Sequence, residues 1–233
     1  MSNLIVLGAQ WGDEGKGKIV DLFSGKFDVV ARYQGGHNAG HTVIVGDRKF
    51  VLKLIPSGIL HPGVQVVIGN GVVVDPIALT DEMQMLEQAG FDVMGRLHVS
   101  NRAHVIFPFH RVVEKVSEAR ADRVAIGTTS RGIGPCYEDK IGRRGIRMAD
   151  LLNPVVFDTL YNYMAEDKRI LAEAFGIGVD LHLEEIRAEY RRLAERIRPL
   201  VCDTAALLNQ AMQAGRRILF EGAQGTMLDI DHG

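Results

Sequence analysis

The sequence predicts an α/β protein with a mainly parallel central sheet, flanking helices and a variant phosphate-binding loop after the first strand. Two observations carry this prediction. Apolar runs typical of buried strands alternate with helical patterns as far as about residue 109, and the segment from about 148 to 215 is then mainly helical. The chain ends soon after one more strand and its loop, so we interpret residues 1–233 as a single α/β domain that is incomplete.

The first element is expected to be a strand over residues 3–9, where the run NLIVLGA ends in glycine. A short continuous apolar run is typical of a strand that is buried on both faces of a sheet. A helix is expected over residues 18–25, with Ile19, Leu22 and Phe23 on one face. Strand, glycine-rich loop and helix in this order are the context in which such a loop binds phosphate.

The middle of the chain alternates between further strands and helices. We expect a strand over 27–34, a hairpin over 42–55 that turns at Gly46-Asp47, a strand over 64–75, a helix over 75–90, and a strand with a turn over 96–109. Pro76 stands near the start of the expected helix and Gly90 stands at its end. These are the positions that proline and glycine favour in helices.

The helical segment over about 148–215 contains an apolar stripe at spacings of four and three residues. Its members are Ile186, Tyr190, Leu193, Ile197 and Leu200. The arginines and glutamates between them are expected on a solvated face. A strand over 218–220 and another glycine-rich loop follow.

Composition and charge limit the kinds of partner. Hydrophobic residues make up 46% of the 233 and the formal net charge is -2, which does not favour nucleic acid as a partner. The N-terminus lacks the pattern of a signal peptide, and no apolar stretch approaches the length of a membrane span. Cys136 and Cys202 are far apart, which favours two reduced thiols. We therefore expect a cytoplasmic protein that binds neither nucleic acid nor membrane.

The first glycine-rich loop carries a variant of a known phosphate-binding pattern. Residues 12–18 fit G-x-x-x-x-G-K, but the next residue is Ile19 instead of serine or threonine. Backbone N–H groups at the start of the following helix can bind phosphate, aided by Lys16 or Lys18. The hydroxyl that usually helps to hold Mg²⁺ is missing, and Asp13 is the nearest oxygen donor. The alternative is a glycine-rich turn with solvated lysines.

A second loop, QGGHNAGHT over residues 34–42, combines small residues with two histidines and an asparagine. Such a segment allows the backbone and short polar groups to approach a ligand. His41 is a candidate general acid, because the unperturbed pKa of histidine lies near neutrality, and His37 is the alternative. A single loop histidine is more often an ordinary surface residue, but two in this context favour a function.

Two further loops offer polar groups to a ligand. Residues 127–140 read GTTSRGIGPCYEDK, and residues 220–233 read FEGAQGTMLDIDHG, in which Gln224 offers an amide. The hydroxyls of the third loop that could donate to a phosphate are those of Thr128, Thr129 and Ser130, and the arginines are Arg131, Arg143, Arg144 and Arg147. The planar guanidinium of arginine binds two phosphate oxygens at once, although each of these arginines could equally lie on a solvated surface.

The four loops, in this order, resemble the N-terminal half of adenylosuccinate synthetase. The motifs are QWGDEGKGK, QGGHNAGHT, GTT-RGIGP-YEDK and FEGAQGTMLDIDHG, and their colinear spacing covers essentially the whole chain. Ser130 and Cys136 stand where the family has glycine or alanine, which are small changes. Family members are nearly twice as long, and the resemblance places guanine recognition, the aspartate-binding loop and further IMP contacts in the part that is missing. We therefore expect a fragment of this enzyme that does not turn over alone.

The resemblance implies GTP-dependent ligation of IMP and L-aspartate to adenylosuccinate, in which GTP phosphorylates the purine O6 and aspartate displaces that phosphate. Asp13 would be the general base that takes the proton from purine N1. It would also ligate Mg²⁺, with the carbonyl of Gly40 as a second ligand. His41 would be the general acid toward the GTP phosphates. For Glu14 we expect only a hydrogen bond that fixes the loop.

The resemblance also implies two sets of binding residues. The GTP site would include Gly12, Asp13, Glu14, Gly15, Lys16, Gly17, Lys18, Gly40, His41 and Thr42. The IMP site would include Asp13, Glu14, Gly15, Lys16, Asn38, Ala39, Gly40, His41, Thr129, Arg143 and Gln224. Arg143 would reach across a two-fold interface to the IMP of the partner subunit, which implies a homodimer.

Two other functions compete with this interpretation. A switch GTPase is disfavoured by Ile19 and by the lack of an Asn-Lys-x-Asp guanine motif in the sequence. A non-catalytic module that binds IMP or phosphate stays open for the fragment itself. The substitution Asp13→Asn distinguishes the ligase from the binding module. A full-length ligase would lose its chemistry, whereas a binding module would lose at most its affinity for metal.

Overall fold

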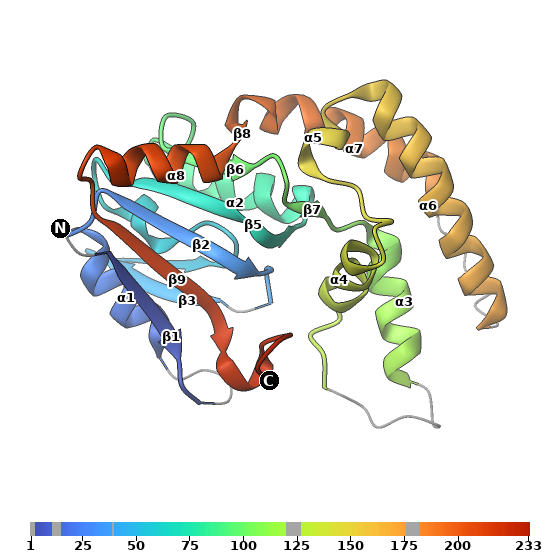
Figure 1. The fold of residues 1–233 in the computed structure, drawn as a ribbon, viewed down its shortest axis with the longest axis horizontal. Coiled ribbons are helices and arrows are strands. Elements are labelled where there is room, and N and C mark those ends of the chain that lie inside the picture. Colours follow the sequence, from blue (N-terminus) through green and yellow to red (C-terminus); the bar gives the residue numbers. More distant parts are fainter. Residues whose placement is uncertain (1–2, 11–14, 39, 120–126, 176–181) are drawn as a thin grey trace.

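The computed structural model describes residues 3–10, 15–38, 40–119, 127–175 and 182–233. A seven-stranded sheet lies at its centre, in the order β1-β9-β2-β5-β6-β8 with β7 beside β5 (Figure 1). Its strands are β1 (Leu4–Gly8), β2 (Val29–Gly35), β5 (Gln65–Val74), β6 (Leu97–Ser100), β7 (His104–Val105), β8 (Val201–Cys202) and β9 (Ile218–Gly225). The described pairings in this sheet are parallel, so the predicted α/β fold with a mainly parallel sheet is confirmed.

A two-stranded antiparallel hairpin and a set of helices complete the described structure. The hairpin consists of β3 (His41–Val45) and β4 (Arg48–Leu52). The α-helices are α1 (Lys16–Ser24), α2 (Pro76–Gln88), α3 (Pro108–Ala119), α4 (Ile133–Ile141), α5 (Met148–Leu151), α6 (Pro154–Ala174), α7 (Leu183–Ile197) and α8 (Thr204–Gln213). Short 3₁₀ turns are η1 (Ser57–Leu60), η2 (Arg198–Leu200) and η3 (Thr226–Leu228).

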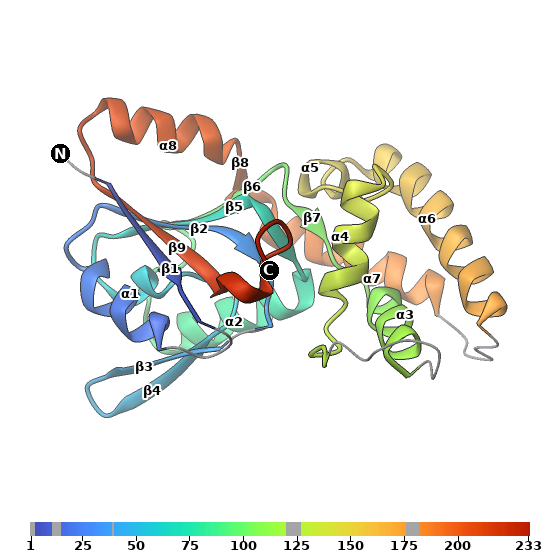
Figure 2. The same ribbon diagram turned by 60° about the horizontal axis from the view of Figure 1, so that its bottom comes forward.

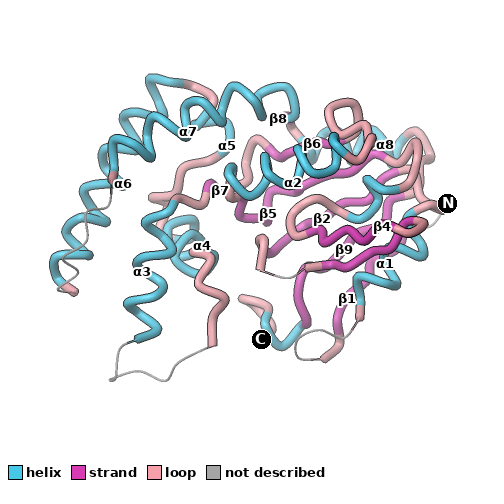
Figure 3. Tube along the Cα trace, turned by 180° about the vertical axis from the view of Figure 1, so that it is seen from behind, coloured by secondary structure: helices cyan, strands magenta, loops and turns pink. Residues whose placement is uncertain are grey.

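Helices cover both faces of the sheet (Figure 2). Because successive residues of a strand point to opposite faces, Val29 packs in a small core with Ala211 of α8, whereas Val30 joins the main core on the other face. α1, α2 and the β3–β4 hairpin lie on that second face. Helices α3 to α7 stand beside β5 and β7 (Figure 3), and Tyr161 and Tyr190 continue the main core into them.

Several elements with strong local signals form as predicted. The hairpin turns at Gly46, whose φ of 59° lies in the left-handed region that favours glycine. Helix α2 begins at Pro76, and the side chain of Asp75 caps it by accepting from the N–H groups of Ile77 and Ala78 at 3.0 and 3.3 Å. Four members of the apolar stripe are buried, namely Ile186, Tyr190, Ile197 and Leu200, and Leu193 packs partly buried against the same core.

Two expectations about the N-terminal elements are wrong. Strand β1 is not buried on both faces, because it is the edge strand that pairs with β9, and Ile5 and Leu7 are each 61% exposed. In α1 the residues expected on the inner face, Ile19 and Leu22, are exposed, whereas Val20 is buried. The helix presents the line of residues 16, 20 and 24 to the protein, which turns Ile19 and Leu22 outward.

Three further boundaries differ from the prediction. The third loop is a helix, α4, from residue 133 on, because Gly132 in the left-handed conformation precedes it and Pro135 fits its first turn. Helix α3 lies before this loop and was not predicted. The helical segment contains the short strand β8, where Val201 pairs with Val99 of β6. Strand β9 extends through residue 225 and so includes part of the expected fourth loop, because it pairs with β1 as far as Gly8.

The described residues contain two free thiols, Cys136 and Cys202, as the sequence led us to expect. Among the helices that the structure describes, none combines the length and the apolar character needed to cross a membrane.

Candidate functional site

The candidate site forms where parallel strands end. Strands β1, β2 and β9 end at Gly8, Gly35 and Gly225, and the first, second and fourth candidate loops are at those ends. In open α/β sheets ligands bind outside the carboxyl ends of the strands. The sheet therefore brings together segments that are far apart in the sequence.

The start of helix α1 is one wall of the site. Gly15 precedes it with a φ of 85°, in the left-handed region, and Lys16 is only 7% exposed at its first position. Gly17 follows in the first turn, and Lys18 is exposed. The N–H of Lys18 donates to the carbonyl of Gly15 at 3.0 Å, and the N–H groups before it in the first turn are placed as at other helix starts that bind an anion. The predicted residues Gly12, Asp13 and Glu14 lie outside the described residues.

His41 lies at the start of strand β3 and its ring packs against α1. A Cβ added to Gly17 would lie 2.8 Å from Cγ of His41, so glycine is required for this close approach. Nδ1 of His41 lies 2.8 Å from Oε1 of Glu221, which is on β9. The His41 side chain is 10% exposed and that of Glu221 is 1% exposed. The ring is therefore held between the first turn of α1 and the sheet.

Glu221 sits in a row of charged groups across the sheet. It is aligned with Arg32 on the neighbouring strand β2, and both side chains are buried. Burial acts to raise the pKa of the Glu221 carboxyl, but the hydrogen bond and charge of His41 and the charges of Arg32 and Lys16 outweigh it, and the pKa is lowered. Glu221 is therefore ionised near neutral pH.

Arg32 ties the second loop to the hairpin. Its guanidinium donates to the carbonyl of Gly36 at 2.8 Å and to the carbonyl of Lys53. Burial lowers the pKa of Arg32, and the charges of Glu221 and Glu82 oppose this. Gly36 lies in the second loop and Lys53 directly follows strand β4, so the buried guanidinium holds the backbone of both segments.

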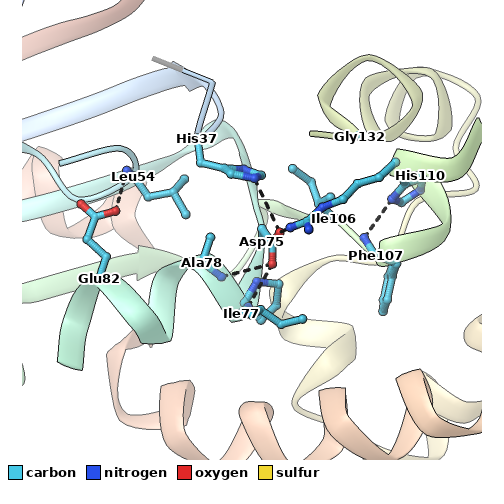
Figure 4. Close-up of polar contacts among 12 residues, drawn as sticks. His37, Leu54, Asp75, Ile77, Ala78, Glu82, Ile106, Phe107, His110 and Gly132 are labelled. Atoms are coloured by element: carbon cyan, nitrogen blue, oxygen red, sulfur yellow. Dashed lines mark hydrogen bonds and ion pairs between the residues drawn. The ribbon is translucent and has the colours of Figure 1, made fainter. Parts of the chain in front are cut away.

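His37, the alternative general acid, has a different environment (Figure 4). Its ring is 1% exposed, and Nε2 lies 3.6 Å from Oδ2 of Asp75. Burial lowers the pKa of His37 to about 4; Asp75 opposes this, and Arg131 and Arg111 add to it. The ring is therefore mostly neutral at neutral pH, and a neutral imidazole is a poor general acid.

Gln224 lines a cavity of about 760 Å³ on the side of the sheet that carries Ile5 and Leu7. Gln34 and Tyr33 of β2, and Lys140 of α4, also line this cavity. A Cβ added to Gly35 would lie 2.4 Å from Cβ of Ala223 and 2.9 Å from Oε1 of Gln224. Glycine at this position lets β2 pass close to the Gln224 amide.

Tyr137 connects helix α4 to strands β2 and β5. Its hydroxyl accepts a hydrogen bond from the N–H of Gly35 at 2.9 Å and donates to the carbonyl of Gly71 at 2.7 Å. Burial raises the pKa of Tyr137 to about 12, so the hydroxyl keeps its proton. The same side chain lines the Gln224 cavity.

Thr129 lines a second cavity, of about 520 Å³, with His37, Lys53, Arg111 and Arg131. The structure therefore places Thr129 and Gln224 in two different cavities. Asp81 and Glu82 also line this cavity, so its lining combines two carboxylates with the three cations Lys53, Arg111 and Arg131, of which Arg111 pairs with Asp75.

The remaining predicted residues of the described chain are spread around these cavities. Asn38 is partly buried, and its Oδ1 is buried without a hydrogen-bond partner among the described residues. Gly40 and Thr42 are exposed. Arg143 is exposed at the turn after α4, with a φ of 58°, and it lines neither cavity. Ala39 lies outside the described residues.

Three buried polar contacts hold the third loop and helix α4 against helices α3 and α6. The N–H of Gly132 donates to Oε2 of Glu114 on α3 at 2.7 Å. Asp139 of α4 lies 3.0 Å from Nε2 of His110 on α3 and 2.8 Å from Nζ of Lys168 on α6. Three helices thus share one buried carboxylate.

The metal prediction has limited structural support. The described residues contain no group of three or more histidine, cysteine, aspartate or glutamate side chains arranged to hold a metal ion. Of the two predicted ligands, Asp13 is not among the described residues. Gly40 is exposed, so its carbonyl, an oxygen ligand of the kind Mg²⁺ prefers, is accessible to an ion.

Sequence reasoning missed Glu221, Arg32 and Tyr137. A signal existed for the first two, because each is a charged residue inside an otherwise apolar strand, and charges are seldom fully buried without a partner. Their pairing depends on the strand order, which the sequence does not show. Tyr137 gave no such signal, because its contacts lie in distant strands.

The fold and this site define an α/β protein of the class that holds its ligand at the carboxyl ends of parallel strands, with a helix N-terminus for an anion. The family model for adenylosuccinate synthetase matches residues 5–233. The chain belongs to this family, as its motifs predicted.

Individual relatives agree with the family match. An adenylosuccinate synthetase of Solibacter usitatus is 66% identical over 233 residues, which are 100% of this chain and 54% of the relative. The protein of that name from Koribacter versatilis is 57% identical over 98% of this chain and 52% of its own length. The chain thus spans about half the length of the curated relatives it matches.

Two solved structures are also similar. One is a fully ligated adenylosuccinate synthetase from Plasmodium falciparum, with a TM-score of 0.89 at 36% identity. The match covers 100% of this chain and 54% of the Plasmodium chain. A succinoaminodeoxyadenylate synthetase of cyanophage S-2L, bound to dGMP and to dATP as an energy donor, has a TM-score of 0.61 at 26% identity, with coverages of 99% and 53%.

Proposed function

We propose that this chain supplies the phosphoryl-transfer groups and part of the IMP site of a GTP-dependent ligase. That ligase joins IMP and L-aspartate to adenylosuccinate through a 6-phosphoryl-IMP intermediate. The observation that carries the proposal is the placement of His41 against the first turn of α1, held by Glu221. A proton donor thus lies beside a helix start that suits phosphate.

The residues of α1 and β3 take the phosphate roles in this proposal. The backbone at Gly15 and Gly17, with Lys16 and Lys18, binds the GTP phosphates. His41 donates a hydrogen bond or a proton to the phosphate on which negative charge develops, and Thr42 lies beside it on β3. Asp13 is the proposed base toward purine N1.

Mg²⁺ is the proposed cofactor. Asp13 and the carbonyl of Gly40 would hold it, and the bound ion would neutralise negative charge on the phosphates. Removing Mg²⁺ with a chelator is expected to weaken GTP binding and to leave the fold unchanged. A chelator that unfolds the chain would contradict this assignment, because the proposed ion is held by a ligand loop and supports no core contact.

IMP is proposed to lie across both cavities. Gln224 faces the cavity beside β1 and β9, and Thr129 faces the second cavity, so the two cavities suit the two ends of one nucleotide. Asn38 lies on the second loop between the strand ends and the hairpin. Arg143 is exposed beyond both cavities, which suits the proposed contact with IMP in the partner subunit of a homodimer.

We further propose that these 233 residues do not complete the reaction alone. The chain spans about half the length of its relatives, and the family resemblance places guanine and aspartate recognition outside it. The cyanophage relative uses dATP as its energy donor, so a related fold accepts another base. A cytoplasmic location stays a prediction. Detectable GTP-dependent synthesis of adenylosuccinate by the purified chain would refute the loss of turnover.

The first test is calorimetric titration of IMP into the purified chain, with and without GDP and Mg²⁺. Saturable binding that Gln224→Ala weakens and Gln213→Ala does not would support an IMP site here. Gln213 is a suitable control because it is exposed on α8 and lines neither cavity. No binding to a chain that circular dichroism shows to be folded would contradict the proposal that these residues form an IMP site.

A non-catalytic binding role is the competing function for the chain alone. It predicts the same titration result but no effect of Asp13→Asn on chemistry in a full-length family member. Loss of turnover in that variant, with IMP affinity retained, would favour the ligase.

A further inference from the structure

Glu221 is a buried carboxylate in the fourth motif, FEGAQGTMLDIDHG. Its side chain is 1% exposed, and strand pairing aligns it with Val6 of β1 and Arg32 of β2. A carboxylate in such a place is costly unless charged or hydrogen-bonded partners compensate it. An apolar residue would fill the same space at a lower cost in desolvation, so a carboxylate at this position indicates a role beyond packing.

The contact that Glu221 makes is with the proposed acid. Oε1 lies 2.8 Å from Nδ1 of His41, although neither carboxylate oxygen has a hydrogen bond of good geometry in the described residues, and the carboxylate is ionised, because its interaction with His41 and the charges of Arg32 and Lys16 outweigh the effect of burial on its pKa. An ionised carboxylate only accepts hydrogen bonds, so the proton between these atoms belongs to Nδ1 of His41. With Nδ1–H engaged, Nε2 is the nitrogen that can face a ligand, and it donates to a phosphate only in the imidazolium form, in which both nitrogens carry a proton.

A second contact fixes the plane of the ring. Cγ and Cδ2 of His41 would lie 2.8 and 2.9 Å from a Cβ added to Gly17, so the ring rests on the backbone of the first turn of α1. The ring is thus restrained by α1 at Cγ and Cδ2 and by Glu221 of β9 at Nδ1. A histidine held in this way is oriented before a ligand arrives.

We propose that Glu221 is a positioning residue for His41: it accepts the Nδ1–H hydrogen bond, so that in the doubly protonated ring the Nε2–H points to the phosphate at the start of α1. The inference rests on the proposed function, in which His41 acts on that phosphate. A carboxylate that orients a histidine through one ring nitrogen while the other reacts is a general catalytic arrangement. Here the two partners come from β9 and β3, far apart in the sequence.

The first test uses the 233-residue chain and reads the ring directly. Long-range ¹H–¹⁵N correlation spectra distinguish a histidine protonated at Nδ1 from one protonated at Nε2. In the unmodified chain we expect the proton on Nδ1 of His41, and in Glu221→Leu we expect the ring to move to the Nε2–H form. The same Nδ1 signature in both would overturn the proposal.

A matched control separates positioning from a general loss of buried charge. Glu82 is also a buried glutamate beside Arg32, but it accepts from the N–H groups of Lys53, Leu54 and Ile55 and has no contact with His41 among the described residues. Glu82→Gln is therefore expected to lower stability and to leave the His41 signature unchanged. If Glu221→Leu does not fold, Glu221→Gln replaces it, and its neutral acceptor is expected to keep Nδ1 protonated but to shift the Nδ1–H resonance.

The second test measures kinetics in a full-length family member that carries this Glu–His pair. Replacing the glutamate by leucine is expected to lower kcat by about 10- to 100-fold while KM for IMP changes by less than about 3-fold, and glutamine should recover much of the loss. Unchanged kcat would overturn the positioning role if replacement of the histidine by asparagine abolishes turnover. If that asparagine variant retains full activity, the proposed function itself fails, so the two failures are distinguishable.

Discussion

The buried ring of His37 makes the stability of the fold depend on pH. Its ordinary pKa of 6.5 is lowered to about 4 in the folded chain, first by burial and then by nearby cations such as Arg131 and Arg111. The unfolded chain therefore binds a proton between these two values that the folded chain rejects. Stability is fully present above the unfolded pKa and falls as the pH drops from about 6.5 toward about 4.

The size of the effect follows from that difference. At ~1.36 kcal/mol per pKa unit, the full difference corresponds to ~3.4 kcal/mol. Solvent in the neighbouring cavity screens part of the interaction, so we expect about 2 kcal/mol of lost unfolding free energy between about pH 7 and about pH 4.5. Replacing His37 by glutamine removes this contribution, because glutamine does not titrate.

Urea unfolding followed by circular dichroism at the two pH values measures this contribution. The pH-dependent loss should be smaller by about 2 kcal/mol in His37→Gln than in the unmodified chain. His232→Gln is the control for removing a histidine, because His232 is exposed near the end of the chain. An equal pH-dependent loss in His37→Gln and in the unmodified chain would refute the reasoning, whatever the absolute stability of the variant.

Three other predictions concern the supports of the site. Asp139→Asn should lower the unfolding free energy by about 3 kcal/mol, because it leaves the buried Lys168 without its counter-charge. The control Asp158→Asn breaks an exposed ion pair and should cost less than about 1 kcal/mol. Similar losses for the two variants in urea unfolding would contradict this prediction. Tyr137→Phe should cost about 1 to 2 kcal/mol in the same assay, and no loss would mean that water replaces the hydroxyl. Gly17→Ala should displace the His41 ring and weaken GDP binding, and an unchanged affinity with unchanged ring resonances would show that the contact is soft.

The sequence predicted elements whose signals are local. Asp75 and Pro76 start helix α2, and Gly46 turns the hairpin, because capping, fixed φ and left-handed φ are properties of one or two residues. The helix that begins after Gly132 was mistaken for a loop, because glycine and proline in its first turn resemble loop residues. The position of β1 at the edge was also missed, because strand order depends on contacts across the whole chain.

In the candidate site, too, the residues with local signals could be predicted and those that depend on distant elements could not. His41 was identified from its own segment, where small residues surround a histidine. Glu221 could not be identified, because its meaning depends on a partner on another element, brought near only by the pairing of β9 with β2 and β1. The lowered pKa of His37 was also beyond sequence reasoning, since it depends on burial and on charges from other elements.

The buried charges beneath the site share one property: each is held by backbone groups or by an ionisable partner. Glu82 accepts from three backbone N–H groups, Arg32 donates to two carbonyls, and Glu221 pairs with His41. Such groups add little stability compared with an apolar core, and removing one partner is destabilising. Their effect is to give the loops around His41 a single arrangement before substrate binds. In the proposed function, charge that develops on a phosphate would meet donors that are already oriented, which is the condition under which electrostatic stabilisation of a transition state is most effective.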